Sequence, residues 1–358
     1  MDELILEKIT KKFADLVAVT DFDLSVEPGQ YIFILGPSGC GKSVLLRLIA
    51  GLEKPSSGSI YVRDALINEV PSHLRNIPVV FQNFALFPHL TVRQNIEYGL
   101  RIRGVAKSEQ NEKSDRILSM LKIQDMAQKK PHQLSAGQRQ RVGLGRALAV
   151  EPAPRILLLD EPLGALDANL HINMQFELKS IQRELGIIFL QVTHNQSDAL
   201  SVGDKIVVMN RGGVEQVGTP SEIFSEPKTR FVAELLGNNN VFEGRVIGKR
   251  DGFTSVKTKH GLFDVPVKKT QPPEGSEVAF VVRLDRLTVN PSNTRDNHFE
   301  ARFRGKVVNG SLVTYEFVSN DQAFKVETHL SSGLLRLQST DQVTLGWNSA
   351  DGYLVTEN

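Results

Sequence analysis

The stretch Gly36-Pro37-Ser38-Gly39-Cys40-Gly41-Lys42-Ser43 has the form G-x-x-x-x-G-K-S and decides the fold class. It follows an apolar run over residues 31–35 and precedes a helical pattern over residues 42–50. In such a loop the glycines allow a tight turn, so that successive N–H groups point at one anion near a helix N-terminus. We therefore predict a phosphate-binding loop between a buried strand and a helix.

Two side chains of this loop suit a nucleotide bound together with Mg²⁺. Lys42 can reach the β- and γ-phosphates, and the hydroxyl of Ser43 can bind the metal ion. A glycine-rich turn that matches the motif by chance is the alternative. The strand before the loop and the helix after it make that alternative a poor one, because the motif requires both.

A second stretch, Ile156-Leu157-Leu158-Leu159-Asp160-Glu161-Pro162, ends a buried strand with two acids. The strand carries them to the carboxyl edge of a parallel sheet, where ligands of open α/β folds bind. Asp160 suits the Mg²⁺ shell, and Glu161 is placed to orient or deprotonate an attacking water. Two solvated acids at a strand end are common when seen alone, but here they accompany the phosphate loop.

Further motifs identify the family. Leu134-Ser135-Ala136-Gly137-Gln138-Arg139-Gln140-Arg141 resembles the LSGGQ signature of ATP-binding-cassette ATPases, and it lies between the phosphate loop and the acidic strand. The other matches run in the family's order over about residues 4–236: an adenine-stacking aromatic at Phe13, the Q-loop at Gln82, the D-loop at 163–167 and the switch histidine at His194. The resemblance therefore implies an α/β P-loop NTPase cassette that hydrolyses ATP.

The resemblance also implies how the site is completed. In cassette ATPases two nucleotide domains pair head to tail, so Ser135, Gly137 and Gln138 would face ATP bound to a second copy. Glu161, His194 and Gln82 would be catalytic, and Mg²⁺ would be held by Ser43, Gln82 and Asp160. The sequence departs from the family at Ala136, where glycine is usual, and the added methyl could crowd the closed dimer.

One cassette in the chain implies a homodimer, or a pair with a related subunit, docked onto separate permease subunits. The stretch Asn83–Leu90 resembles the importer region that forms a groove for two integral-membrane permeases. Phe84, Leu86 and Phe87 would contact a permease helix there. Equally, they would fill a core between subdomains.

After residue 237 the pattern changes to short alternating strands separated by turn signals such as Asn309-Gly310. We predict two domains, a nucleotide-binding domain over 1–237 and a smaller all-β, OB-like barrel over 238–358. The second resembles the regulatory domain of importer ATPases for sugars, polyamines, sulfate, molybdate and ferric iron. In the segment 281–287 the Pro-Glu pair usual in that domain is replaced.

Within these importers the segments 163–167 and 174–179 resemble the polyamine group most, with ferric iron, sulfate or sugar importers as alternatives. A solute-binding protein would then be an indirect partner, and the chain would be peripheral on the cytoplasmic face of a bacterial membrane. A cassette ATPase outside transport is the hypothesis from another class; those that act on the ribosome or in DNA repair carry two cassettes in one chain or a long coiled-coil insertion, and neither is found here.

Composition excludes several other classes. The chain of 358 residues has 42 basic and 41 acidic residues, so it lacks the basic excess of a nucleic-acid binder. One cysteine excludes an internal disulfide. The sequence contains no run of about 18 apolar residues, so it predicts no membrane-spanning helix. Its acidic N-terminus does not resemble a signal peptide.

Overall fold

The computed structural model describes residues 3–150, 152–164, 167–237, 239–250, 252–267, 272–291, 297–330, 337–338 and 341–355. The chain forms two compact units, Met1–Ser221 and Glu222–Asn358. The predicted domain boundary between residues 237 and 238 stays a prediction. In the part of the chain that the structure describes, no helix is long and apolar enough to cross a membrane.

The first unit is built on a six-stranded sheet in the order β10-β9-β3-β8-β7-β6. Neighbouring strands from β9 to β6 pair in parallel, and β10 pairs with β9 antiparallel. Every residue of β3 is buried, as expected for a parallel strand covered on both faces. The strands are β3 (Tyr31–Leu35), β6 (Val79–Val80), β7 (Ile156–Asp160), β8 (Ile188–Thr193), β9 (Lys205–Asn210) and β10 (Gly213–Gly218).

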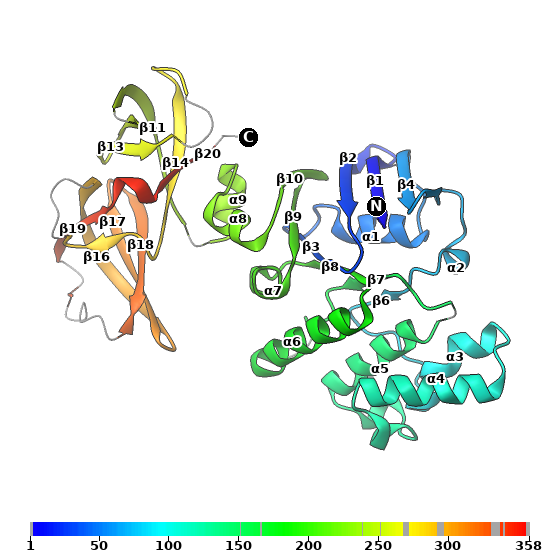
Figure 1. Ribbon diagram of the computed structural model, residues 1–358. Coiled ribbons are helices and arrows are strands. Elements are labelled where there is room, and N and C mark those ends of the chain that lie inside the picture. The colour runs from blue at the N-terminus through cyan, green and yellow to red at the C-terminus, as the bar shows by residue number, and fades with distance from the viewer. Residues whose placement is uncertain are drawn as a thin grey trace. The chain divides into compact units, whose positions relative to one another are not determined.

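A second, antiparallel sheet in the order β2-β1-β4-β5 shares its hydrophobic core with the six-stranded sheet and with helix α1 (Lys42–Ala50). Figure 1 shows β1, β2 and β4 beside α1, in blue. The strands are β1 (Leu4–Phe13), β2 (Leu16–Val26), β4 (Ser57–Val62) and β5 (Ala65–Leu66). The expected helix over residues 42–50 is confirmed.

The carboxyl end of α1 is fixed by Arg75, the last residue of α2 (Ser72–Arg75). Its buried guanidinium donates hydrogen bonds to the carbonyl oxygens of Leu48 and Ile49 at 2.8 and 3.0 Å. A cation at this position satisfies carbonyl groups that have no partner within the helix. Burial lowers the pKa of Arg75 below its ordinary value.

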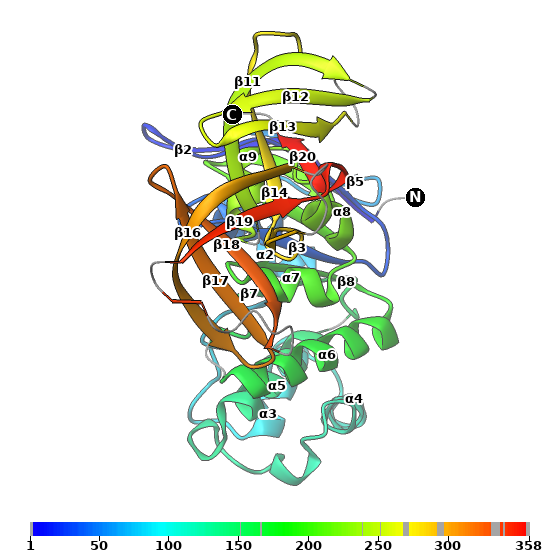
Figure 2. The same cartoon turned by 90° about the vertical axis from the view of Figure 1, so that its left-hand side faces the viewer.

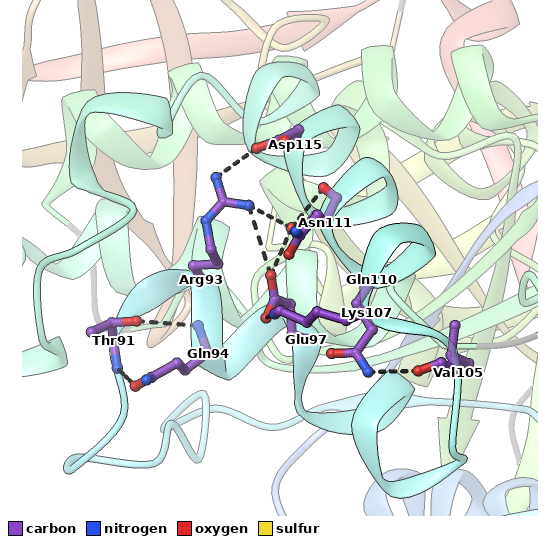
Figure 3. Close-up of polar contacts among 10 residues, drawn as sticks. Thr91, Arg93, Gln94, Glu97, Val105, Lys107, Gln110, Asn111 and Asp115 are labelled. Atoms are coloured by element: carbon purple, nitrogen blue, oxygen red, sulfur yellow. Dashed lines mark hydrogen bonds and ion pairs between the residues drawn. The ribbon is translucent and has the colours of Figure 1, made fainter.

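Three helices form a separate layer of the first unit: α3 (Val92–Ile102), α4 (Lys107–Met120) and α5 (Ala136–Leu148). Figure 3 shows the polar contacts that join α3 to α4. The buried carboxylate of Glu97 receives the ammonium of Lys107 at 2.6 Å and the hydroxyl of Ser114 at 3.0 Å, with Arg93 beside it.

Helices α6 (Ala168–Leu185) and α7 (Gln196–Val202) complete the first unit. Helix α6 begins at the N-cap Asp167, whose side chain accepts from the backbone N–H of Leu170 at 3.0 Å. This aspartate belongs to the predicted D-loop. Ala165 and Leu166 of that loop lie outside the described residues.

The second unit confirms the all-β prediction for the end of the chain, preceded by the short helices α8 (Pro220–Ser225) and α9 (Arg230–Leu235). Its strands form two five-stranded sheets, ordered β13-β12-β11-β14-β20 and β15-β19-β16-β17-β18. Figure 2 shows β11, β12 and β13 side by side in yellow-green. The strands are β11 (Asn239–Arg250), β12 (Phe253–Thr258), β13 (Gly261–Pro266), β14 (Glu277–Arg283), β15 (Thr288–Val289), β16 (Asn297–Asn309), β17 (Leu312–Ser319), β18 (Gln322–His329), β19 (Gln342–Trp347) and β20 (Gly352–Val355).

An aromatic cluster fills the core that the two sheets of this unit share. Phe242 of β11 lies at its centre, fully buried, with its ring stacked on Phe280 at 4.8 Å and on Phe324 at 5.0 Å. Trp347 and His260 lie at 5.1 and 6.1 Å from the same ring. Alternation along β16, buried at Phe299, Ala301 and Phe303, sends one face of the strand into this core.

Candidate functional site

The loop between β3 and α1 needs glycine at particular positions. Gly39 and Gly41 have φ values of +80° and +104°, a region that side-chain-bearing residues rarely adopt. A Cβ at Gly41 would lie 2.2 Å from the carbonyl oxygen of Ala18, and one at Gly36 would lie 2.4 Å from that of Met209. Gly36 and Gly41 therefore lie where close packing leaves no room for a side chain, and Gly39 lies where the backbone conformation favours glycine, which suits a loop that wraps around a phosphate.

Lys42 opens helix α1 and is held against the loop itself. Its ammonium donates to the carbonyl oxygens of Gly36 and Pro37, both at 2.8 Å, and lies 3.8 Å from the sulfur of Cys40. Lys42 is 6% exposed, and the Cys40 side chain is buried. A positive charge is thus fixed within the loop, next to the first N–H groups of a helix.

Ser43 and Asp160 come together although they are far apart in the sequence. The Ser43 hydroxyl donates to the Asp160 carboxylate at 3.3 Å across the carboxyl edge of β7. Burial raises the pKa of Asp160, and the charge of Glu161 adds to the rise, whereas the hydrogen bond from Ser43 and the charges of Arg47 and Lys42 oppose it. A hydroxyl and a carboxylate side by side are ligands that Mg²⁺ prefers.

Glu161 lies between two polar side chains. Its carboxylate is 3.0 Å from Nδ1 of His194 and 3.5 Å from the amide nitrogen of Gln82. Its backbone is left-handed, with φ of +46°, a conformation that costs about 1–3 kcal/mol for a residue of this kind. The structure therefore brings together the three residues that the sequence nominates as catalytic.

A buried carboxylate supports the loop that carries His194. Asp198 of α7 is 2% exposed and accepts from the hydroxyl of Thr193 at 3.1 Å. On its other side it contacts Nε2 of His171 at 2.6 Å and the side-chain amide of Gln175, both from α6. We call these four residues the Asp198 junction. Sequence reasoning missed it, because Thr193 and Gln175 were noted only within motifs read for other roles, and nothing in the sequence shows that they meet Asp198.

The signature residues form a separate cluster at the start of α5. The hydroxyl of Ser135 accepts from the backbone of Gln138 at 3.3 Å, and the Gln138 side chain accepts from the backbone of Ser135 at 2.9 Å, a complete capping box. A Cβ at Gly137 would lie 3.2 Å from Leu170 of α6. Ala136 is the first helical residue, where alanine is favourable.

The predicted adenine-stacking residue and the predicted permease-contact residues differ in how exposed they are. Phe13 ends β1 with 40% of its surface exposed, and the ammonium of Lys11 lies 4.7 Å from its ring centre. Phe84 is 4% exposed and belongs to the core, whereas Leu86 and Phe87 are half-buried. Phe87 packs on Tyr98 at 4.3 Å. Of the two roles weighed for this stretch, Phe84 therefore takes the core role.

Comparison with known protein families matches residues 19–164 to the ABC transporter family. The spermidine/putrescine import ATP-binding protein PotA of Trichodesmium erythraeum is 41% identical over 90% of this chain and 86% of its own length. The protein of the same name from Bacillus thuringiensis subsp. konkukian is 37% identical over 98% of this chain and 95% of its own.

The chain is also similar to solved structures of ATP-binding cassettes. A dimeric ATP-binding cassette in a post-hydrolysis state, bound to ADP and Pi, aligns with a TM-score of 0.53 and 32% identity over 61% of this chain and 98% of its own. The cbiO1 protein of Clostridium perfringens, part of the transporter complex cbiONQ, aligns with a TM-score of 0.59 and 30% identity over 65% of this chain and 93% of its own.

Proposed function

Since this chain belongs to the ABC transporter family of ATP-binding cassettes, we propose that it is the ATP-hydrolysing subunit of a polyamine importer. The observation that carries ATP hydrolysis is the position of the Glu161 carboxylate, between Gln82 and His194 and next in sequence to the Asp160–Ser43 pair. The polyamine assignment is supported by relatives named for spermidine and putrescine import, which match this chain over most of their length.

The residues present fit ATP and Mg²⁺. The backbone of Gly36–Ser43 and the Lys42 ammonium would hold the phosphates, and Phe13 would stack on the adenine. Ser43 and Asp160, with Gln82, would hold Mg²⁺, which when bound neutralises charge on the phosphates. Glu161 would orient or deprotonate the attacking water, and His194 would keep the Glu161 carboxylate in place.

The assembly follows from the same proposal. A second copy would place its Ser135, Gly137 and Gln138 against the nucleotide of the first, head to tail. Two permease subunits would dock at Asn83–Leu90, where Phe87 and Tyr98 offer a partly exposed aromatic pair. A solute-binding protein would deliver the polyamine, and the chain would act on the cytoplasmic face of the membrane. Residues 238–358 would regulate rather than catalyse.

Reconstituted transport tests this function. The chain would be co-expressed with candidate permease subunits and a solute-binding protein from the same organism, and the complex would be placed in proteoliposomes. We expect spermidine or putrescine to stimulate ATP hydrolysis and to accumulate in the vesicles. Sulfate, ferric iron and maltose serve as competing substrates. Stimulation by one of these and not by a polyamine would overturn the substrate assignment and leave the importer ATPase intact.

A further inference from the structure

The turn that follows Gln82 is strained at two successive residues. Phe84 and Ala85 have φ values of +58° and +44°, in the left-handed region that residues other than glycine, asparagine and aspartate seldom occupy. The backbone N–H of Phe84 donates to the carbonyl of Phe81 at 2.8 Å, and that of Ala85 donates to the Asn83 side chain at 3.2 Å. These local bonds shape the turn, but a turn of this kind persists only where its surroundings impose it.

Arg146 of helix α5 binds this turn through hydrogen bonds to its backbone. One terminal nitrogen of its guanidinium donates to the carbonyl oxygen of Ala85 at 2.5 Å, and the other donates to that of Phe84 at 2.9 Å. The same guanidinium lies 5.4 Å from the ring centre of Phe87. The planar fork of arginine suits two adjacent carbonyls, and it keeps its charge although burial lowers its pKa.

Close packing of the helix against the turn supports this contact. Gly143 lies on α5 before Arg146, and a Cβ there would come 3.2 Å from Cβ of Phe84. The buried Asn95 of α3 pairs with the other end of the turn, since its side-chain oxygen accepts from the N–H of Phe87 at 2.9 Å. The strained turn is therefore fixed by two helices of the helical layer.

The turn connects two parts of the proposed site. At one end Gln82 lies 3.5 Å from the Glu161 carboxylate. Arg146 lies on the helix whose N-cap is the signature residue Ser135. A movement of α5 relative to the six-stranded sheet would therefore act on Gln82 through the two carbonyl groups that Arg146 holds.

We propose that Arg146 is a positioning residue that holds the Phe84–Ala85 turn in its left-handed form and so ties the placement of Gln82 to helix α5. Its effect on ATP turnover rests on the proposed function, whereas its hold on the turn does not. Neither depends on which solute is transported.

Hydrogen exchange of the full-length protein tests the hold on the turn. In Arg146→Lys the charge remains but the bidentate fork is lost, so we expect the amides of residues 83–87 to exchange about tenfold faster. The matched control is Arg101→Lys, because Arg101 also lies 5.4 Å from an aromatic ring, that of Tyr98, at the exposed end of α3. Exchange at residues 83–87 that is unchanged in Arg146→Lys, or equally raised in Arg101→Lys, would overturn the proposal.

ATP turnover tests the link to Gln82. We expect Arg146→Lys to lower kcat about tenfold with KM for ATP unchanged, because the loop Gly36–Ser43 is untouched. Arg101→Lys should leave both constants as they are. A rise in KM with kcat unchanged would show that Arg146 acts on nucleotide binding and not through Gln82.

A rescue experiment separates strain from general loss of packing. Glycine adopts the left-handed region without cost, so adding Ala85→Gly to Arg146→Lys should restore slow exchange and most of the lost kcat. The control is Ala106→Gly in the same background. Ala106 has a φ of −59°, so glycine at this position relieves no left-handed strain. Equal recovery in both double variants, or none in either, would contradict a role for Arg146 in holding a strained turn.

Discussion

The phosphate loop of the first unit and the aromatic cluster of the second are built in opposite ways. The loop uses left-handed glycines and a buried lysine bonded to carbonyls, and beside it burial, together with the charge of Glu161, raises the pKa of Asp160. The cluster surrounds Phe242 with rings that bury apolar surface and leave almost no charge inside. The loop places polar and charged groups for nucleotide binding, and this lowers the stability of the fold. The cluster stabilises the fold by burying apolar rings and places no reactive groups.

The largest expected effect is on turnover at Glu161. Because Glu161 is the carboxylate that contacts both His194 and Gln82, Glu161→Gln should lower kcat about 10²–10⁴-fold and keep ATP binding. Measured kcat and nucleotide affinity check this. Lys42→Ala is the contrasting variant, since removing the phosphate counter-charge should weaken binding itself. Turnover of Glu161→Gln close to that of the wild type would remove Glu161 from the catalytic role.

The reverse behaviour is expected in the aromatic cluster. Phe242→Ala removes the ring at the centre of the second unit and should lower its free energy of unfolding by about 3–5 kcal/mol. Calorimetry of the full chain would show one transition at a lower temperature, while ATP turnover measured below that transition stays near the wild-type value. A large loss of turnover in the folded variant would contradict the division of chemistry and stability between these regions.

A smaller effect involves His260, at the edge of the same cluster. Burial lowers the pKa of His260, the charge of Lys259 lowers it further, and the hydrogen bond with Gln322 opposes both. A histidine whose pKa is lower in the folded state adds stability above its unfolded pKa of about 6.5, and this stability is lost as the pH falls through the folded value. We expect the transition of the second unit to shift down between about pH 7.5 and pH 5. In His260→Gln this shift should shrink, and an unchanged shift would assign it to other groups.

The smallest effect is expected at Ala136. Because this residue opens α5 directly after Ser135, Ala136→Gly should lower the free energy of unfolding by about 0.5 kcal/mol. If the methyl group crowds a nucleotide held by a second copy, the same change should raise turnover. Thermal unfolding and steady-state kinetics measure both. A fall in turnover would show that the methyl group is tolerated at the dimer interface.

The nucleotide site was largely predictable because its motifs are local. The strand over 31–35 and the helix over 42–50 are found as expected, and the acid pair lies at the carboxyl end of β7, with Asp160 as its last residue. That Ser43 meets Asp160, and that Glu161 meets His194, also follows from parallel strands that end at one edge.

The Asp198 junction and the Arg146 contact were not predictable in this way. His171 and Gln175 meet Asp198 only because α6 packs against α7, and side-chain periodicity does not specify which helices become neighbours. Arg146 looks like an ordinary helix residue, and the left-handed backbone of Phe84 and Ala85 contradicts their local preference. Such conflicts between local preference and structure tend to occur at functional positions.

The left-handed backbone of Glu161 has a consequence for laboratory evolution. Glycine is the residue best suited to φ of +46°, so Glu161→Gly would relieve strain and remove the carboxylate at once. A library screened for thermal tolerance alone would therefore enrich an inactive substitution at this position. A selection for heat resistance therefore also needs to require growth on the transported solute. Without that requirement, the selected variants would be stable and bind nucleotide but would not hydrolyse it.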